Sequence, residues 1–407
     1  MEQSVLSWLD EQQSTMEQIL PVWCNVNSGS FNPEGVNAVG EMIADYVQNN
    51  LNVRTERIKT QPVEVVTERG EVELKPVGDL WRFYKANKPA NPTIQLLLTG
   101  HLDTVFPKES SFQECTMLKD GVMGGPGVAD MKGGILLMLN TLQAIEKSAI
   151  ADQVDWQILL NPDEEIGSHA SVKYLTMAAK EADIGMVFEP SMPNGDLAGA
   201  RKGSGNFSLI VDGKAAHAGR EFELGRNAIS ALALAMLELE KINQSGHNIT
   251  LNLGKIQGGG PVNIVPDKAI CHFNARVTSH EEAEIAQKHI DAVVAAVNAR
   301  EGFKAQLVGK FTRPAKPATE QQQKLFELVS DCGQELGLNI QFKPTGGCCD
   351  GNNLAAAGLP NVDSLGVQGG NIHSHQEYID LASLSTRAKL SAMIITRLAT
   401  EKSKWVL

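Results

Sequence analysis

The sequence predicts an α/β protein in which a smaller α+β unit is inserted into a larger core. In the first half of the chain, apolar strand-like runs alternate with segments of helical periodicity, which is typical of a largely parallel sheet with helices on both faces. From about residue 206 to residue 311 the order changes to β-α-β-β-α-β, the split arrangement of a ferredoxin-like unit. The length of 407 residues accommodates two or three domains.

The expected elements follow from these patterns in chain order. In the first half we expect strands over residues 93–98, 154–160 and 184–189, and a helix over 131–147 with Ile135, Leu136, Leu139 and Leu142 on one face. In the insert we expect strands over 206–211, 248–256, 269–277 and 304–311, and helices over 226–242 and 280–300. After Lys316 the α/β rhythm returns with a helix over about 320–337, a glycine-rich loop over 345–353, a strand near 361–366 and a helix over about 381–400.

These elements divide the chain into three segments. Residues 1–202 and 313–407 are expected to form the two parts of a discontinuous core, and residues 203–312 the inserted unit.

The composition excludes several classes of partner. The formal net charge is -12 and the isoelectric point is near 5.3, whereas proteins that bind nucleic acid or anionic membranes need clustered Lys and Arg. The first 20 residues lack the basic start and the apolar stretch of a signal peptide, and no later apolar run approaches the ~20 residues of a membrane span. We therefore expect a cytoplasmic protein without nucleic-acid or membrane partners.

Polar residues follow each expected strand of the core. His101 and Asp103 come after the first strand, Glu164 and Glu165 after the second, and Glu189 at the end of the third. His373 follows the expected strand near 361–366, and Asp130 stands where the expected helix begins. Ligands of α/β sheets bind beyond the carboxyl ends of the strands, so these side chains are expected to converge on one edge.

Each of these residues taken alone has an ordinary explanation. A single histidine is often a packed or surface residue, and Glu164 and Glu165 fit a solvated loop. Together, however, clustered carboxylates repel each other unless protons or cations intervene. Imidazole and carboxylate are zinc ligands, and one carboxylate can bridge two metal ions, for which Asp130 is the natural candidate. Asp103 then fits the carboxylate that orients a metal-bound imidazole, although the pattern leaves open which carboxylate contacts His101.

Seven motifs in order also resemble a known family. They are GHLDTV, GGPGVADMKGG, NPDEEIGS, FEP, GKAAHAG, PVNIVPDKA and IHSHQEY. They resemble the motifs of the co-catalytic zinc amidohydrolases, which include glutamate carboxypeptidases of the carboxypeptidase G type, acetylornithine deacetylase, succinyl-diaminopimelate desuccinylase and the aminoacylases. The resemblance extends from about residue 20 to the C-terminus, and it implies a zinc-peptidase core with an inserted lid and dimerisation domain.

The resemblance implies a role for each clustered residue. One Zn²⁺ is held by His101 and Glu189, a second by Glu165 and His373, and Asp130 bridges the two. Cobalt is expected to substitute for zinc. Glu164 is implied as the general base, and Asp103 as the aspartate behind the zinc ligand. His373 is preferred over His375 because the family's histidine precedes a glutamate, here Glu377, by four or five residues.

Three further residues of the insert match the family. His217 in GKAAHAG is implied to stabilise the oxyanion from a neighbouring subunit, which makes a homodimer through the insert the expected assembly. Asn263 and Arg276 are implied to hold a substrate carboxylate. The alternatives are that Asn263 only shapes the turn before Pro266 and that Arg276 is a salt-bridged strand residue.

The expected reaction is zinc-dependent hydrolysis of a peptide or acyl amino acid at an amide bond next to a free carboxylate. HLDTVFP, DEEIGS and GKFTRP are most similar to the glutamate carboxypeptidase type, in which a cation near Arg313 helps to select a C-terminal Glu. The segment LAGARKGSG departs from that type, so acetylornithine deacetylase or another N-acyl amino acid deacylase is the alternative. A non-catalytic metal-binding protein is the alternative of another class, and the presence of Glu164 with all five ligands argues against it.

Overall fold

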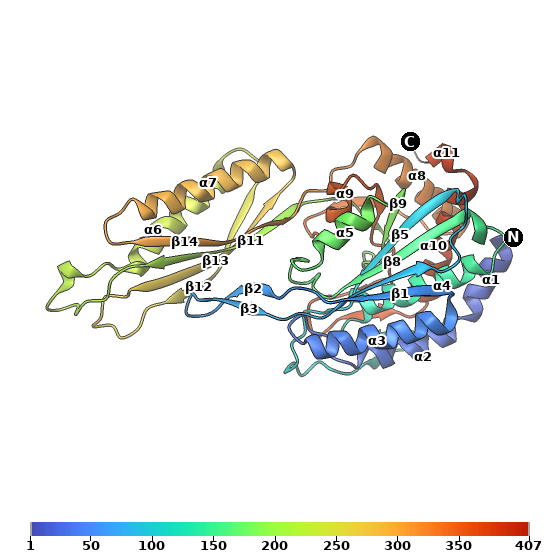
Figure 1. The fold of residues 1–407 in the computed structure, drawn as a ribbon, viewed down its shortest axis with the longest axis horizontal. Helices are drawn as coiled ribbons and strands as arrows, with labels where there is room; N and C mark the ends of the chain where they lie inside the picture. The colour runs from blue at the N-terminus through green and yellow to red at the C-terminus, as the bar shows by residue number, and fades with distance from the viewer. Residues whose placement is uncertain (1, 406–407) are drawn as a thin grey trace.

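A computed structural model describes residues 2–405 and has a six-stranded mixed sheet at its centre (Figure 1). The strand order is β1-β4-β8-β5-β9-β16. Strands β8, β5, β9 and β16 are mutually parallel, whereas β4 is antiparallel to both of its neighbours. The strands are β1 (Val53–Ile58), β4 (Leu80–Lys85), β5 (Ile94–His101), β8 (Val154–Asn161), β9 (Ile184–Val187) and β16 (Asn361–Val362). The prediction of a largely parallel α/β sheet is confirmed.

Helices cover both faces of this sheet, as its continuous apolar strands require. Leu96 and Leu98 of β5 pack into the large core on one face, and Leu97 between them packs into a smaller core on the other. The helices that contribute to the large core are α1 (Glu2–Glu11), α2 (Gln13–Cys24), α3 (Pro33–Asn50), α4 (Gly133–Glu146), α8 (Glu320–Glu335), α10 (Ser383–Thr400) and α11 (Lys402–Trp405). Those of the smaller core are α5 (Val172–Ala179) and α9 (Asp350–Ala356).

The insert is a second sheet with its own apolar core. Its strands are β11 (Gly203–Asp212), β12 (Thr250–Gly258), β13 (Lys268–Val277) and β14 (Lys304–Arg313), in the order β12-β13-β11-β14 with every pair antiparallel. Helices α6 (Ala228–Glu240) and α7 (His280–Asn298) cover one face. Figure 1 shows this unit extending away from the six-stranded sheet. The chain order is the expected β-α-β-β-α-β, and the division of the chain at residues 203 and 312 remains a proposal.

Three smaller pairings were not expected from the sequence. They are the hairpin β2–β3 (Val63–Val66 and Val72–Lys75), the parallel pair β10–β15 (Leu197–Arg201 and Phe342–Thr345), and the small sheet β17-β18-β7-β6 (Gly369–Gly370, Tyr378–Asp380, Val122–Gly124 and Thr116–Lys119). These strands are short, and several are exposed, so they lack the apolar alternation that marks a strand in a sequence.

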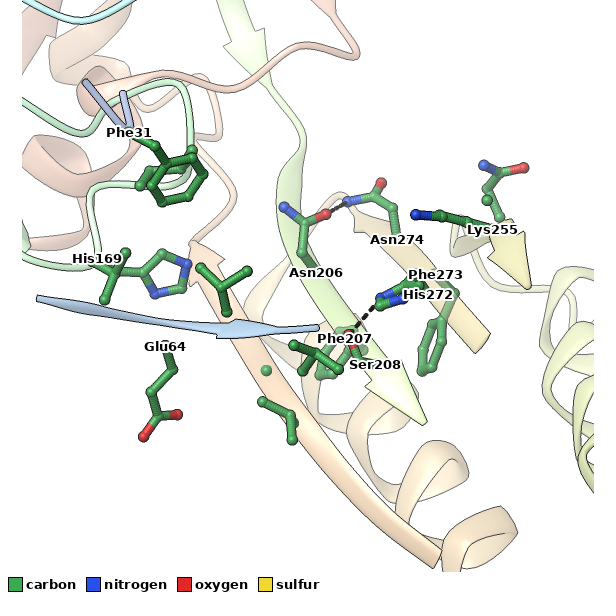
Figure 2. A pocket seen from close by; sticks show the side chains of 18 residues that line it. Phe31, Glu64, His169, Asn206, Phe207, Ser208, Lys255, His272, Phe273 and Asn274 are labelled. Carbon is green, nitrogen blue, oxygen red and sulfur yellow. Dashed lines mark hydrogen bonds between the residues drawn. The ribbon is translucent and has the colours of Figure 1, made fainter. Parts of the chain in front are cut away.

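The tip of the β2–β3 hairpin packs against the insert's sheet, on the face that α6 and α7 do not cover. Gly70 at its tip has φ +74°, and a Cβ there would lie 3.1 Å from Ile270 and 3.2 Å from Ile210. A cavity of about 430 Å³ lies between the hairpin and the sheet, and Figure 2 shows His169, Asn206 and His272 among its lining side chains. The candidate metal ligands are not among the residues that line this cavity.

Candidate metal centre

The carboxyl ends of the parallel strands bring the predicted residues to one edge of the sheet. His101 is the last residue of β5, Glu164 and Glu165 lie in the loop after β8, and Glu189 follows β9 by two residues. Strands β8, β5 and β9 are neighbours in the sheet, so these three positions meet in space.

His101 is buried, with 1% of its surface exposed, and its two ring nitrogens face different partners. Nδ1 lies 2.9 Å from the backbone oxygen of Asp103, which can only accept a hydrogen bond, so Nδ1 carries the hydrogen. Nε2 lies 3.1 Å from Asp130 Oδ1 and 3.8 Å from Glu189 Oε2. Burial lowers the pKa of His101, but its hydrogen bonds to the three acidic residues raise the pKa well above the usual value. The acidic side chains around Nε2 therefore favour a cation on this nitrogen, either a proton or a metal ion.

Asp103 connects His101 to the loop of the two glutamates. Its carboxylate is fully buried and accepts hydrogen bonds from the backbone N–H of Glu164 (3.0 Å), from that of Glu165 (3.2 Å) and from the hydroxyl of Ser30 (2.7 Å). Its Oδ1 lies 3.4 Å from His101 Nδ1. One aspartate therefore fixes both the imidazole and the loop that carries Glu164 and Glu165.

Asp130 lies between the two histidines. Its Oδ1 faces His101, and its Oδ2 lies 3.2 Å from His373 Nε2. The residue lies in a short π-helical turn (Val128–Lys132) with non-helical φ and ψ, so it precedes α4 by three residues instead of opening that helix as expected. Burial raises the pKa of Asp130, but the hydrogen bonds to His101 and His373 outweigh this effect and lower the pKa.

Glu377 holds this turn in place, a function that the sequence reasoning missed. Its Oε1 accepts hydrogen bonds from the backbone N–H of Ala129 (2.9 Å) and of Asp130 (3.0 Å), and the side chain is 1% exposed. Burial, with the nearby charge of Asp130, raises the pKa of Glu377 to about 7. The sequence signal was present in IHSHQEY, where Glu377 served only to choose between His373 and His375.

Glu165 and His373 complete the second half of the cluster. Glu165 Oε2 lies 3.1 Å from His373 Nε2, while its Oε1 is buried without a hydrogen-bond partner. Burial and the charge of Asp130 raise the pKa of Glu165 to about 7. His375 instead lies 3.4 Å from Ser110 Oγ and stacks on Phe112, so the geometry favours His373.

The donor set fits divalent metal ions. Ligand atoms of His101, Asp130 and Glu165 lie within 4.8 Å of one another, and so do those of His101, Glu164 and Glu189. Burial raises the pKa of Glu164 and Glu189, and the charges of neighbouring carboxylates add to the increase, so ionising these groups together is unfavourable without a cation. Bound cations would remove this conflict and satisfy the orphaned Glu165 oxygen. Imidazole nitrogen and carboxylate oxygen are the donors that zinc takes in catalytic sites.

A cavity of about 350 Å³ opens from this cluster. Asp130, Glu165, Glu189 and His373 line it together with residues of the 345–349 loop. Arg201, which the sequence reasoning did not single out, also lines it and makes two hydrogen bonds to the buried Asp363 (2.8 and 3.0 Å). The only sequence signal for Arg201 was its place in LAGARKGSG, at the end of a short run of small and apolar residues that forms β10.

The residues expected from the insert separate into two groups. His217 and Asn263 are exposed neighbours: His217 pairs with Ile264 in an antiparallel bridge, and Asn263 O accepts from the backbone N–H of Ala218 at 2.9 Å. The hydrogen bonds and ion pairs recorded for His217 and Asn263 in residues 2–405 stay within the insert. Arg276 by contrast reaches the cavity loop, where its Nη1 lies 3.3 Å from Gly346 O.

Arg313 differs from its expected role. Its side chain is 2% exposed, and its guanidinium is paired with Glu164 and Asp350 at 2.6 Å each. A side chain that is buried and paired in this way contacts the candidate base instead of an incoming carboxylate.

Known proteins resemble the chain in both sequence and fold. Carboxypeptidase G2 of Pseudomonas sp. strain RS-16 is 28% identical over 396 residues, which cover 96% of this chain and 91% of that protein. Succinyl-diaminopimelate desuccinylase of Methylibium petroleiphilum is 26% identical over 340 residues, or 79% of this chain and 86% of that protein. Among solved structures, dipeptidase Dug1p of Saccharomyces cerevisiae matches with a TM-score of 0.75 at 14% identity, covering 98% of both chains. Aminopeptidase PepT of Bacillus cereus matches with a TM-score of 0.70 at 22% identity, covering 95% of this chain and 99% of that one.

Residues 97–397 match the sequence model of peptidase family M20/M25/M40. This span holds the whole candidate metal centre and the insert. In residues 2–405 no helix combines the length and apolar content of a membrane span. The hydrolase relatives set aside the hypothesis of a non-catalytic metal-binding protein. The chain is a metallohydrolase and belongs to peptidase family M20/M25/M40.

Proposed function

We propose that the protein is a di-zinc exopeptidase of the glutamate carboxypeptidase type, which hydrolyses a peptide or N-acyl amide bond next to a free carboxylate. The position of Asp130 carries the proposal, because its two oxygens face His101 and His373 at 3.1 and 3.2 Å. A carboxylate between two imidazoles is suited to bridge two metal ions. Similarity to carboxypeptidase G2 along 96% of the chain supports the substrate class.

We assign the ligands in two groups that share one residue. His101 and Glu189 would hold one zinc ion, Glu165 and His373 a second, and Asp130 both, with cobalt as a substitute. Zinc bound there would polarise the substrate carbonyl and lower the pKa of water toward neutrality. Asp103 keeps Nδ1 of His101 protonated, so that Nε2 presents its lone pair to the metal.

Glu164 is the proposed general base. A ligand oxygen of Glu164 lies within 4.8 Å of those of His101 and Glu189, close to where the substrate would react. Glu164 would take a proton from the attacking water as the new C–O bond forms, and would then pass this proton to the amine nitrogen as the C–N bond breaks. The products are a carboxylic acid and a free amino acid.

The insert would supply residues that bind the substrate. Arg276 reaches the loop that lines the cavity, and its planar guanidinium suits a carboxylate. We propose that Asn263 assists Arg276 and that His217 stabilises the oxyanion. Because His217 and Asn263 are exposed neighbours whose hydrogen bonds within residues 2–405 stay in the insert, these two roles fit a site on a second copy of the chain.

The surface of the insert supports this homodimer. Strand β12 is an edge of its sheet, so one side of its backbone has no partner strand in the described chain. Ile256 on β12 is 59% exposed, and Leu234 and Leu237 on the adjacent α6 are 55% and 61% exposed. An apolar helix face beside an open strand edge fits pairing with an identical copy, since a two-fold contact buries the same patch twice.

A deacylase that acts on N-acyl amino acids is the second candidate. The similarity to succinyl-diaminopimelate desuccinylase favours it, and so does the segment LAGARKGSG, which departs from the glutamate carboxypeptidase type. The two candidates share the metal centre and differ in the group that the cavity accepts.

A substrate panel separates these candidates. Release of ninhydrin-reactive product is measured for acyl-Glu, acyl-Asp, acetylornithine and dipeptides, before and after chelation and after return of zinc or cobalt. We expect acyl-Glu to give the highest kcat/KM, chelation to abolish turnover, and either metal to restore it. A clear preference for acetylornithine would favour the deacylase, and full activity of the metal-free protein would refute the zinc mechanism.

A further inference from the structure

Arg313 lies where the insert joins the core. It is the last residue of β14, and its backbone pairs with Ser204 of β11. Strands β11 and β14 are the two strands through which the chain enters and leaves the insert. The Arg313 side chain crosses from this junction into the core, where it is 2% exposed.

The guanidinium binds Glu164 at two points. Nη2 donates to Glu164 Oε1 at 2.6 Å and to the backbone oxygen of Glu164 at 3.0 Å. The Glu164 side chain is 10% exposed, so water does not compete strongly for this pair. Both the carboxylate and the backbone of Glu164 are therefore held by one rigid, planar group.

The other arm of the guanidinium is anchored. Nη1 donates to Asp350 Oδ1 at 2.6 Å. Asp350 is itself fixed, because Ser168 Oγ donates to its Oδ1 at 2.7 Å and Asn161 Nδ2 donates to its Oδ2 at 2.8 Å. The guanidinium of Arg313 is thus anchored to Asp350 on one side and binds Glu164 on the other.

We propose that Arg313 is a positioning residue, which holds Glu164 Oε1 so that the carboxylate faces His101 and Glu189. The inference rests on the proposed function, since it takes Glu164 as the general base. It adds that the base is positioned from a strand of the insert. Rotation of the insert would therefore move Glu164, and the two parts of the molecule would be coupled at the reacting group.

The first test compares Arg313→Gln with Arg313→Lys on acyl-Glu and acyl-Ala substrates. Because a small displacement of a catalytic group costs up to about 100-fold in rate, we expect Arg313→Gln to lower kcat by about 10- to 100-fold. KM should stay within about twofold and the zinc content unchanged, since Arg313 touches neither the substrate nor a metal ligand. Arg313→Lys keeps a positive charge beside Glu164 and should recover part of kcat.

The second test is a double-mutant cycle with Glu164→Gln. If Arg313 acts through Glu164, Arg313→Gln should lower the residual kcat much less in the Glu164→Gln background than in the wild type. The melting temperature of the metal-free protein should show the same coupling without any activity, because Arg313→Gln takes the cation away from Glu164, and Glu164→Gln removes one of the two carboxylates that pair with Arg313. Arg387→Gln is the matched control, because Arg387 is 1% exposed and its side chain, within residues 2–405, donates to backbone oxygens only, those of Gly366, Gly195 and Ser364. Arg387→Gln should change the melting temperature by the same amount in the wild type and in the Glu164→Gln protein.

The outcomes distinguish this inference from the proposed function. If the wild type is inactive on the whole panel, the proposed function fails, and the melting-temperature cycle still decides whether Arg313 and Glu164 are coupled. If the wild type is active but Arg313→Gln raises KM for acyl-Glu alone with kcat unchanged, Arg313 binds substrate and the inference is wrong. The inference is also wrong if Arg313→Gln lowers kcat by the same factor in the wild type and in the Glu164→Gln background. Should Arg313→Gln not fold, Arg313→Lys enters the same cycle.

Discussion

Asp103→Asn tests the support behind the metal centre. The carboxylate of Asp103 accepts one backbone N–H on Oδ1, from Glu164, and one on Oδ2, from Glu165. An asparagine replaces one of these oxygens with an NH₂ group, which only donates. In either orientation, one buried backbone N–H therefore loses its acceptor, and the negative charge opposite His101 is lost as well.

The expected magnitude follows from these contacts. A buried donor left without a partner costs about 1 to 3 kcal/mol, so the free energy of unfolding of the metal-free protein should fall by that amount. Loss of the carboxylate behind a metal-bound histidine typically weakens metal binding by about 10- to 100-fold, and we expect zinc affinity to fall in this range. The kcat should fall with it, because Glu164 and Glu165 depend on the same carboxylate for their position.

Zinc affinity is measured by competition with a chromophoric chelator, and stability by denaturant unfolding of the metal-free protein. Asp196→Asn is the matched control, since Asp196 is 2% exposed and accepts the backbone N–H of Gln341 at 3.0 Å without contacting the cluster. The control should lose stability and keep its zinc affinity. If Asp103→Asn binds zinc as tightly as the wild type, Asp103 does not orient His101 and the reasoning fails.

Three more predictions concern the base, the assembly and pH. Glu164→Gln should lower kcat by orders of magnitude with about two zinc ions retained, whereas Glu165→Gln should reduce zinc content; swapped phenotypes would reverse the two assignments. Inactive His217→Ala and inactive Glu164→Gln proteins, dissociated and reassembled together, should recover about one quarter of wild-type activity, since half the dimers are mixed and each mixed dimer has one intact site. Proven heterodimers that stay inactive would exclude the action of His217 across the dimer. The metal-free protein should lose stability as the pH rises from about 4.5 toward 7, because folded Glu377, with its pKa raised to about 7, keeps a proton that the unfolded chain has released. Glu377→Gln should flatten this part of the profile in thermal melts, and an unchanged slope would mean that other groups cause it.

The parts of the fold that were predictable are those fixed by burial. Strands β5 and β8 are buried on both faces, so their apolar runs identify them in the sequence. Helices α4 and α10 pack against each other in the large core and are buried along most of their length, so their apolar content identifies them as well. The β2–β3 hairpin is a local pairing, but its strands are short and largely exposed, so they lack the apolar runs that mark β5 and β8. The small sheet around β18 depends on pairing between distant segments, since Tyr378 of β18 lies opposite Gly124 of β7. No local pattern reveals such partners.

For the candidate metal centre, the sequence identified which residues carry the chemistry better than it identified which residues contact each other. The convergence of His101, Glu165 and Glu189 followed from strand ends alone, and the structure places His101 in two clusters, one with Glu165 and one with Glu189. The position of Arg313 could not be predicted, because a basic residue at a strand end fits a substrate carboxylate and a buried ion pair equally well. The partner was decided by Asp350, whose own hydrogen bonds fix it beside β14. Glu377 was missed for a similar reason, since its carboxylate binds backbone amides that carry no sequence signature.

The β2–β3 hairpin has a mechanical consequence for the insert. A body joined at two neighbouring points keeps one easy rotation, about the line through these points, and here the points are the chain crossings beside Gly203 and Arg313. A third contact away from this line resists the rotation, and the tip of the hairpin provides one, since a Cβ added at Gly70 would lie 3.1 Å from Ile270 and 3.2 Å from Ile210. Figure 1 shows the β2–β3 hairpin reaching toward the sheet of the insert. The hairpin therefore supports the insert at a third point and opposes its rotation relative to the core. A segment without any candidate site residue would in this way help to keep Arg276 beside the loop that lines the cavity.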